Sequence, residues 1–256
     1  MKFAIKSIVA ATAFVAAGAA SAALVTVNVG QTVNGLTLEA DSFGALRFDD
    51  GLIDALNLGM VTASGFGGAT VTTVGEPGAY EYGGIIASAK VSSVTYDDAT
   101  GNVVRVVTTG GARQVATNNS ALSGGWVEVG NLDVRLDTME IFGTVQGKSN
   151  VSGSVAQNYS GKLFSIGGLT GDTTWQQGVA LTQLTGLAIT TDAFKALDLS
   201  LGLKNVGRAG LQAAAANFGS IDSQITVTPA IPEPSTYALM GLGLVGLALV
   251  RRRAAK

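Results

Sequence analysis

Apolar and β-branched residues alternate with polar ones in short runs through the middle of the chain, and glycine or Asp/Asn turns separate these runs. A period of two with tight turns is typical of half-buried antiparallel strands. The clearest pair is 85–96 and 103–109, because Asp97 can cap the turn between them and Gly101 can take a positive φ. The same pattern predicts further strands over 24–29, 69–74, 113–117, 126–129, 132–136, 140–146, 163–166, 179–189 and 224–228.

Helical spacing interrupts the strands in two or three places. The stretch 191–201 has apolar residues at helical intervals, with Thr191–Asp192 as its cap and Gly202 as its end. The alanine-rich stretch 209–218 predicts a second helix, which stops before a glycine. Residues 43–58 are ambiguous, because glycines break an otherwise helical pattern. We therefore expect a mainly β fold: an antiparallel, sandwich-like ectodomain with two or three short helices.

The N-terminus has the pattern of an export signal. A basic start is followed by the uncharged, apolar stretch 8–20 and by Ala20-Ser21-Ala22, the small-x-small pattern of a signal-peptidase site. We expect signal peptidase to remove residues 1–22 by cutting after Ala22, with Ala20 and Ala22 as the small residues that it recognises.

The C-terminus has a second apolar segment, 235–250, followed by Arg251-Arg252-Arg253. As a helix this segment would span about 24 Å, a little less than the ~30 Å hydrocarbon core of a bilayer. Three arginines without an acidic partner suit the cytoplasmic side of a membrane better than a protein core. The sequence therefore predicts a C-terminal transmembrane helix over 235–250, with the arginines as its stop and residues 23–228 outside the cytoplasmic membrane.

Directly before this segment lies Pro232-Glu233-Pro234, whose prolines fix φ and disfavour helix, so that the tripeptide stays extended at the membrane edge. Tripeptide, apolar run and arginine cluster together resemble the PEP-CTERM sorting signal of Gram-negative bacteria, here over 229–256. The resemblance implies recognition of Pro232, Glu233 and Pro234 by an exosortase, a membrane-embedded cysteine protease or transpeptidase. It also implies delivery toward the cell surface or extracellular matrix, and it implies nothing about the ectodomain.

Composition narrows the possible chemistry. The chain has neither histidine nor cysteine, which excludes disulfides, Ser-His-Asp and Cys-His catalysis, and histidine-containing zinc sites. Between the two terminal segments, residues 23–228 contain 10 basic and 17 acidic residues. A net negative charge argues against nucleic acid as a partner.

Three carboxylates near Trp126 are the main candidates for catalysis. Asp133, Asp137 and Glu140 could supply the acid and base of a glycoside hydrolase, and Asp133 and Asp137 would share one face of a strand. Polar residues on the solvent side of a half-buried strand explain them more simply, because Leu132, Val134 and Leu136 alternate with the charges.

Other polar groups have two interpretations each. Asp49, Asp50 and Asp54 could bind calcium, but their spacing is not that of an EF-hand loop, and a solvated turn or helix edge explains them. Ser200 and Lys204 stand four residues apart and could form a hydroxyl–amine pair. Four tyrosines could stack on sugars or ligate haem iron: Tyr80, Tyr82, Tyr96 and Tyr159.

The interpretation we favour is a non-catalytic surface or matrix protein that acts in adhesion or in contact with exopolysaccharide. Its partners would be exosortase and signal peptidase, the membrane through 235–250, and exopolysaccharide, with no catalytic residue, metal or cofactor. It would be anchored in the inner membrane with its ectodomain in the periplasm, or released to the cell surface after processing. The alternatives are a hydrolase acting on extracellular polysaccharide and a small-ligand module for haem or calcium.

Overall fold

The computed structural model describes residues 23–75, 81–230, 240 and 242. Within these residues, no helix has the length and apolar character needed to cross a bilayer. The predicted signal peptide, the residues Pro232, Glu233 and Pro234, and the arginines 251–253 lie outside the described part. So does the expected transmembrane helix 235–250, apart from residues 240 and 242.

Sixteen strands and three helices make up this part of the chain, and every named strand pair is antiparallel. The strands are β1 (Leu24–Asn28), β2 (Thr32–Val33), β3 (Leu36–Leu38), β4 (Phe43–Phe48), β5 (Val61–Phe66), β6 (Thr70–Val74), β7 (Gly84–Asp97), β8 (Val103–Thr109), β9 (Gly111–Ala116), β10 (Gly125–Arg135), β11 (Glu140–Ser149), β12 (Gln157–Ser165), β13 (Gly168–Gly171), β14 (Gly178–Thr185), β15 (Ala188–Ile189) and β16 (Gly219–Pro229). The helices are α1 (Asp50–Leu58), α2 (Thr191–Leu201) and α3 (Asn205–Ala214). The expected mainly β, antiparallel fold with short helices is confirmed.

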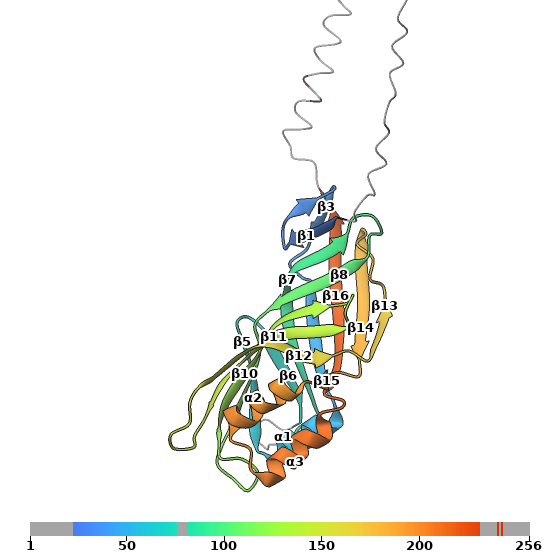
Figure 1. Cartoon of the computed structure of the whole chain (residues 1–256). Coiled ribbons are helices and arrows are strands. Elements are labelled where there is room, and N and C mark those ends of the chain that lie inside the picture. The colour runs from blue at the N-terminus through green and yellow to red at the C-terminus, as the bar shows by residue number, and fades with distance from the viewer. Residues whose placement is uncertain (1–22, 76–80, 231–239, 241, 243–256) are drawn as a thin grey trace, which may run out of the picture.

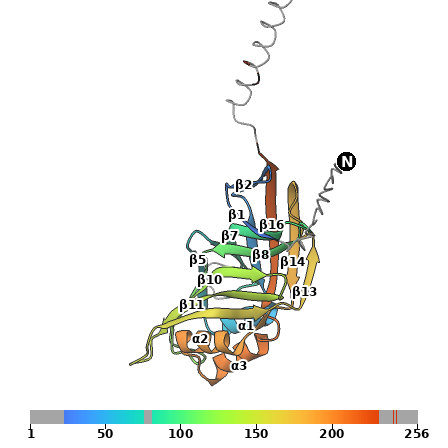
Figure 2. The same cartoon turned by 45° about the horizontal axis from the view of Figure 1, so that its top comes forward.

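The strands form one sheet that curls round on itself rather than two separate sheets. Its main path runs β13-β14-β16-β4-β7-β8-β10-β11-β12-β15. Because β12 leads into β13 and β14 leads into β15, the pairs β12–β15 and β13–β14 are two parts of one bent pairing. The long strands β14, β16 and β4 therefore face β8 and β10–β12 across a common interior (Figures 1 and 2).

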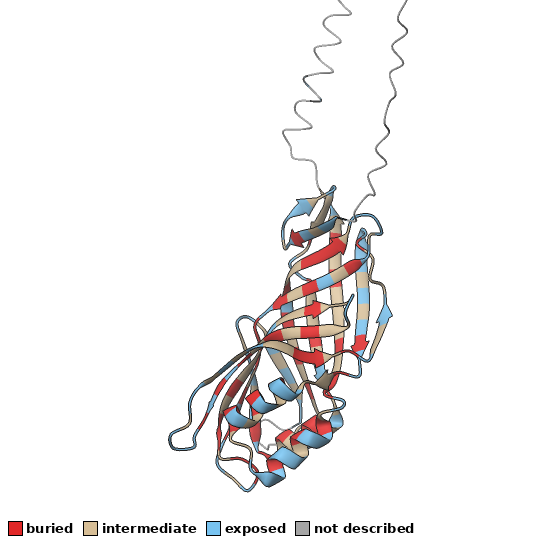
Figure 3. Ribbon diagram, viewed as in Figure 1, coloured by how far each residue is buried: buried red, intermediate tan, exposed pale blue. Residues whose placement is uncertain are grey.

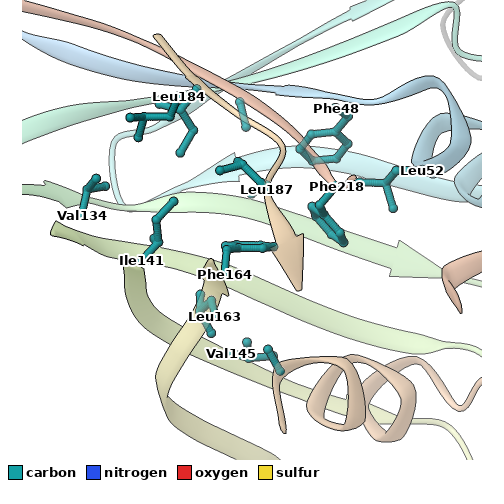
Figure 4. Close-up of a cluster of buried hydrophobic side chains, with 14 of the residues drawn as sticks. Phe48, Leu52, Val134, Ile141, Val145, Leu163, Phe164, Leu184, Leu187 and Phe218 are labelled. Atoms are coloured by element: carbon teal, nitrogen blue, oxygen red, sulfur yellow. The ribbon is translucent and has the colours of Figure 1, made fainter. Parts of the chain in front are cut away.

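The core lies inside this curled sheet and under the helices. Buried residues alternate with half-buried or exposed ones along most strands, and α1 and α2 turn buried apolar residues inward (Figure 3). Three phenylalanines from separate segments meet at the helix end: Phe218 lies 6.2 Å from Phe48 and 5.0 Å from Phe164, measured between ring centroids. Around them pack aliphatic side chains from β10–β12, β14 and α1 (Figure 4). Burial of this apolar surface is the main force that holds the cysteine-free fold together.

The helices begin and end at recognisable signals, although not all where expected. In α2 the cap is Thr190, whose hydroxyl accepts from Ala193 N, and Gly202 ends the helix in the left-handed conformation. The ambiguous segment 43–58 contains both β4 and α1, which Asp49 caps. The second helix is present, but its predicted bounds 209–218 were wrong, because α3 starts at Asn205 and ends at Ala214, and Gly219 begins β16.

Both ends of the described ectodomain lie at the same pole, and the three helices lie at the opposite pole (Figure 1). Ala23 O accepts a hydrogen bond from Asp98 N, and Ala230 N donates to Gly35 O. Asp98 lies in the β7–β8 turn, and Gly35 lies between β2 and β3. The chain therefore enters and leaves the folded part at one end.

Candidate functional site

The outer face of β8, β10 and β11 presents the first of the predicted carboxylates, but it is surrounded by cations. Arg105 donates to both oxygens of Asp133, from Nε at 2.5 Å and from Nη2 at 2.9 Å. Arg135 donates to Oδ2 of the same carboxylate at 3.1 and 3.3 Å, and its guanidinium lies 4.0 Å from the centroid of the Phe142 ring. Asp133 is thus the centre of an ion-pair cluster on the sheet.

The other two carboxylates do not join it. Asp137 was expected to share a strand face with Asp133, and this was wrong, because β10 ends at Arg135 and Asp137 lies exposed in the following turn. Its Oδ1 accepts from Thr138 N at 2.9 Å. Glu140 pairs with Lys162 across β11 and β12, with 2.8 Å between Oε1 and Nζ.

These partners lower the pKa values of Asp133 and Glu140 instead of raising them. Burial alone would raise the pKa of Asp133, but hydrogen bonds from Arg105 and Arg135 hold it below its ordinary value. The hydrogen bond from Lys162 lowers the pKa of Glu140. A glycosidase acid needs a raised pKa so that it stays protonated at neutral pH. Both groups are therefore in environments suited to ion pairing.

Further along the same strands, Trp126 lies on the outer face beside a shallow groove. Directly opposite it in the pairing register are Val115 of β9 and Lys148 of β11. The Arg113 guanidinium lies 4.8 Å from the centroid of the indole ring and pairs with Glu128 at 3.0 Å. The groove has a volume of about 350 Å³ and is lined by Trp126 and by residues of β11 and the turn after it: Lys148, Ser149, Asn150, Val151, Gly153 and Ser154. Sequence reasoning had named Trp126 only as a neighbour of the carboxylates.

A row of polar side chains runs beside Trp126 across four strands. Arg113, Glu128, Gln146 and Asn158 are consecutive partners in the register of β9, β10, β11 and β12. Neighbouring strands lie about 4.8 Å apart, so the row is a closely spaced line of charged groups and amides. Strand alternation places these side chains on one face, but the register that aligns them follows only from the fold.

The interior of the curled sheet contains an apolar cavity of about 80 Å³. It forms because small residues face inward from several strands: Gly44, Ala87, Ala89, Ala112, Gly130 and Ala180. Pockets for drug-sized ligands have volumes of about 300–1,000 Å³. The cavity is therefore a modest packing defect of the core. The open grooves on the outside are larger: the polar one beside Trp126, and another of about 400 Å³ along β13, β14 and β16.

The aspartates considered for calcium have structural roles or are exposed. Asp49 caps α1 by accepting from Gly51 N, and it also accepts from the Asn217 amide at 2.8 Å. Asp50 and Asp54 are exposed. Among the residues that the structure describes, no group of three acidic, histidine or cysteine side chains is arranged to hold a metal ion.

The Ser200–Lys204 pair does not form. Ser200 Oγ is fully buried and donates to Ala196 O at 2.7 Å. Lys204 lies in the loop before α3 and donates from Nζ to Asn118 Oδ1 at 2.9 Å. The two groups that sequence spacing suggested as a dyad therefore face different surroundings.

The described tyrosines are engaged in packing or hydrogen bonds, and Tyr80 lies outside the described residues. Tyr96 is buried, stacks on Trp175 with 5.2 Å between ring centroids, and accepts from Asn34 Nδ2 at 3.2 Å. Tyr159 donates to Lys162 O at 3.0 Å. Tyr82 is half-buried, and its backbone N–H and C=O both bond to the Asn57 side chain.

The C-terminal tail starts where the sheet ends. β16 continues to Pro229, and Ala230 is held by its bond to Gly35. Residues 230–253 match the model of the PEP-CTERM protein-sorting motif. The tail is a PEP-CTERM sorting signal. A chain that carries the PEP-CTERM motif is processed by exosortase, exported and sorted to the cell surface.

The part of the chain before the PEP-CTERM tail has only weak similarity to known proteins. No curated protein matches the chain in sequence. A crystal structure of the C-terminal domain of HtaA from Corynebacterium glutamicum is similar at a TM-score of 0.44 with 11% sequence identity, and the match covers 75% of this chain and 99% of that one. This likeness is too distant to carry an argument about the activity of the domain that precedes the PEP-CTERM tail.

Proposed function

We propose that this protein is a non-catalytic surface or matrix protein that contacts exopolysaccharide after sorting by exosortase. The observation that carries the proposal is the PEP-CTERM motif at residues 230–253, directly after the last strand of the ectodomain. A sorting signal at this place directs the delivery of the domain that precedes it. That domain is β-rich and contains neither histidine nor cysteine.

The proposed topology follows from the charges at the two ends. Signal peptidase cuts after Ala22, and Arg251, Arg252 and Arg253 hold the end of 235–250 on the cytoplasmic side. Residues 23–228 then form the extracytoplasmic domain. Exosortase acts at Pro232-Glu233-Pro234, and the ectodomain stays anchored until that step.

The non-catalytic part of the proposal is supported by the surroundings of the acidic residues. Asp133 and Glu140 have lowered pKa values and cationic partners, and Asp137 lies apart from them in a turn. A carboxylate that accepts from two arginines has its lone pairs occupied, which leaves neither a free base nor a protonated acid.

Alanine substitution of Pro232, Glu233 and Pro234 together tests the sorting step. We expect wild-type protein at the cell surface or in the medium, and the triple variant held in the inner membrane with its C-terminal segment still attached. Cell fractionation gives the location, and intact-mass measurement shows both cleavages.

Lys256→Ala, beyond the arginines, is the matched control for a change in the tail and should be sorted like wild type. Finding the wild-type chain at full mass in the cytoplasm would refute the proposal. Equal sorting of the triple variant would refute the role of the tripeptide.

A further inference from the structure

The indole of Trp126 has a different neighbour on each side. Arg113 approaches from β9, with its guanidinium carbon 4.8 Å from the ring centroid. The groove lies on the other side, because all its other lining residues belong to β11 or to the turn that follows it. One side of the ring is thus held by a cation and its other side borders an open, mostly polar hollow.

Hydrogen-bonding groups without protein partners lie in this hollow and beside it. Lys148 lines the groove, and Gln146 and Asn158 lie beside it in the neighbouring row of the same face. All three are exposed, and within the described residues their side chains make no hydrogen bond or ion pair. Amides offer both donors and an acceptor, and Lys148 offers three donors and a positive charge. Arg113 is neutralised by Glu128, so Lys148 leaves this part of the face locally positive.

The strands under the groove are held rigidly from behind. Helix α2 packs closely against β10 and β11: a Cβ atom on Gly147 would lie 2.6 Å from Ser200 Cβ, and one on Gly125 would lie 2.5 Å from Ser200 O. Only glycine permits this approach. A site on rigid strands loses less conformational entropy when it binds a ligand than a site on a loop.

The groove also lies at the helix pole. Gly125, next to Trp126, contacts α2, and the helices lie opposite the end where Ala23 and Ala230 leave the fold (Figure 1). In an anchored protein this pole is the one farthest from the attachment point. The groove therefore faces away from the attachment point.

We propose that the Trp126 groove binds an acidic sugar unit of a polysaccharide. The apolar face of the sugar ring would stack on the indole, its hydroxyls would bond to the Asn150 amide in the groove, and its carboxylate would pair with Lys148. The amides of Gln146 and Asn158, in the next row, would bond to the adjoining unit of the polymer. This proposal rests on the proposed exopolysaccharide contact and gives it a place and a chemical class.

Titration of the full chain with a polyuronate and with a neutral glucan of similar length tests it. Trp126→Ala should weaken polyuronate binding about tenfold, the size expected for loss of one aromatic contact. Trp126→Phe keeps a ring and should restore most of the affinity. Lys148→Ala should weaken polyuronate binding and make it less sensitive to salt, because exposed charge pairs are screened.

Lys195→Ala is the matched control: Lys195 lies exposed on α2 and should bind like wild type. Thermal melts of each variant show that the fold is kept. Equal binding by wild type and Trp126→Ala would overturn the groove as the site and leave the exopolysaccharide contact standing. Tighter binding of the glucan than of the polyuronate would overturn the acidic specificity. Failure of the wild type to bind either polymer would overturn the contact itself.

Discussion

At the scale of single residues, ion pairing decides what the carboxylates of the outer face can do. Asp133 is mostly buried, with its side chain 15% exposed, whereas Arg105 and Arg135 are 46% and 41% exposed. Solvent therefore screens both pairs, and their joint contribution to stability is of the order of 1 kcal/mol.

Asp133→Asn should lower the free energy of unfolding at neutral pH by about 1 kcal/mol, because the amide keeps the shape but loses the charge. The folded pKa of Asp133 is lowered. Its stabilising effect is thus complete above the ordinary aspartate pKa of about 4 and is lost as pH falls through the folded value.

Urea denaturation from pH 7 to pH 2 measures this effect. The difference between wild type and Asp133→Asn should shrink at the acid end. Asp54→Asn, at an exposed position of α1, is the control and should follow wild type throughout. A difference between wild type and Asp133→Asn that stays constant down to pH 2 would contradict the ion-pair explanation.

The residue scale also shows what sequence alone could and could not give. The turn at Asp97 was predictable, since its Oδ1 accepts from the N–H groups of Ala99 and Thr100 as local turn chemistry requires. The partners of Asp133 were not predictable, because Arg105 lies in another strand and only the register brings it near. Local turn chemistry can therefore be predicted from neighbouring residues in the sequence. Partners on different strands can be identified only once the strand pairing is known.

At the scale of elements, the glycines of α3 show why the start of this helix was difficult to predict. The helix predicted over 209–218 starts four residues too late, and α3 includes both Gly207 and Gly210, although glycine is unfavourable inside a helix. In the fold they allow close packing: a Cβ on Gly207 would lie 2.4 Å from Ala121 O, and one on Gly210 would lie 3.3 Å from Ala55 Cβ. Tertiary contact thus outweighs the unfavourable helix propensity.

Strand β10 shows where a pattern of period two fails to predict the length of a strand. The sequence predicted two strands, 126–129 and 132–136, but one strand runs from Gly125 to Arg135 with an irregularity between Gly130 and Asp133. Asn131 takes φ 51° there, and its side chain accepts from Gly110 N. A bulge reverses the alternation of faces, so a pattern of period two breaks where the strand itself continues.

Two glycine-to-alanine substitutions within strands should change the free energy of unfolding in opposite directions. Gly147→Ala places a methyl group 2.4 Å from Trp126 O and 2.6 Å from Ser200 Cβ, so β11 and α2 must separate. We expect a loss of about 1–3 kcal/mol in the free energy of unfolding, as for other overpacked sites. Chemical denaturation measures it.

Gly44→Ala is the matched variant, on β4 at the edge of the interior cavity. Its new methyl group would meet Thr108 Cγ2 at 3.8 Å and Ile221 Cγ2 at 3.9 Å, which are ordinary contacts. We expect a gain of about 0.5–1 kcal/mol from reduced freedom of the unfolded chain. A loss of stability in Gly44→Ala equal to that in Gly147→Ala would contradict the packing described for both.

At the scale of the whole molecule, the sequence predicted the class of fold but not its closure. Runs of period two with glycine turns are enough to predict many antiparallel strands. The short strands β2, β3, β5 and β13 were missed, and the joining of β12–β13 to β14–β15 depends on long-range pairing that no local pattern contains. The Trp126 groove was missed for the same reason.

The two proposed functions, sorting and sugar binding, depend on opposite ends of the molecule. The segments for export and sorting precede Ala23 and follow Ala230, which both lie at one pole, and the proposed sugar site lies at the other. Neither end depends on the chemistry of the other, so variants of the tripeptide should leave polymer binding intact and Trp126 variants should leave sorting intact.

Strand β16 leads directly into the tail, and it is paired with β14 on one side and with β3 and β4 on the other. While the C-terminal segment anchors the protein and the helix pole holds a polymer, a pull between the two ends enters this strand along its own axis. Its ladders are then loaded in shear, and many hydrogen bonds must fail together before the strand slides. A protein tethered in this way behaves as a mechanical link, and single-molecule pulling from the C-terminus against residue 126 should meet a higher rupture force than pulling from the C-terminus against residue 181 on β14.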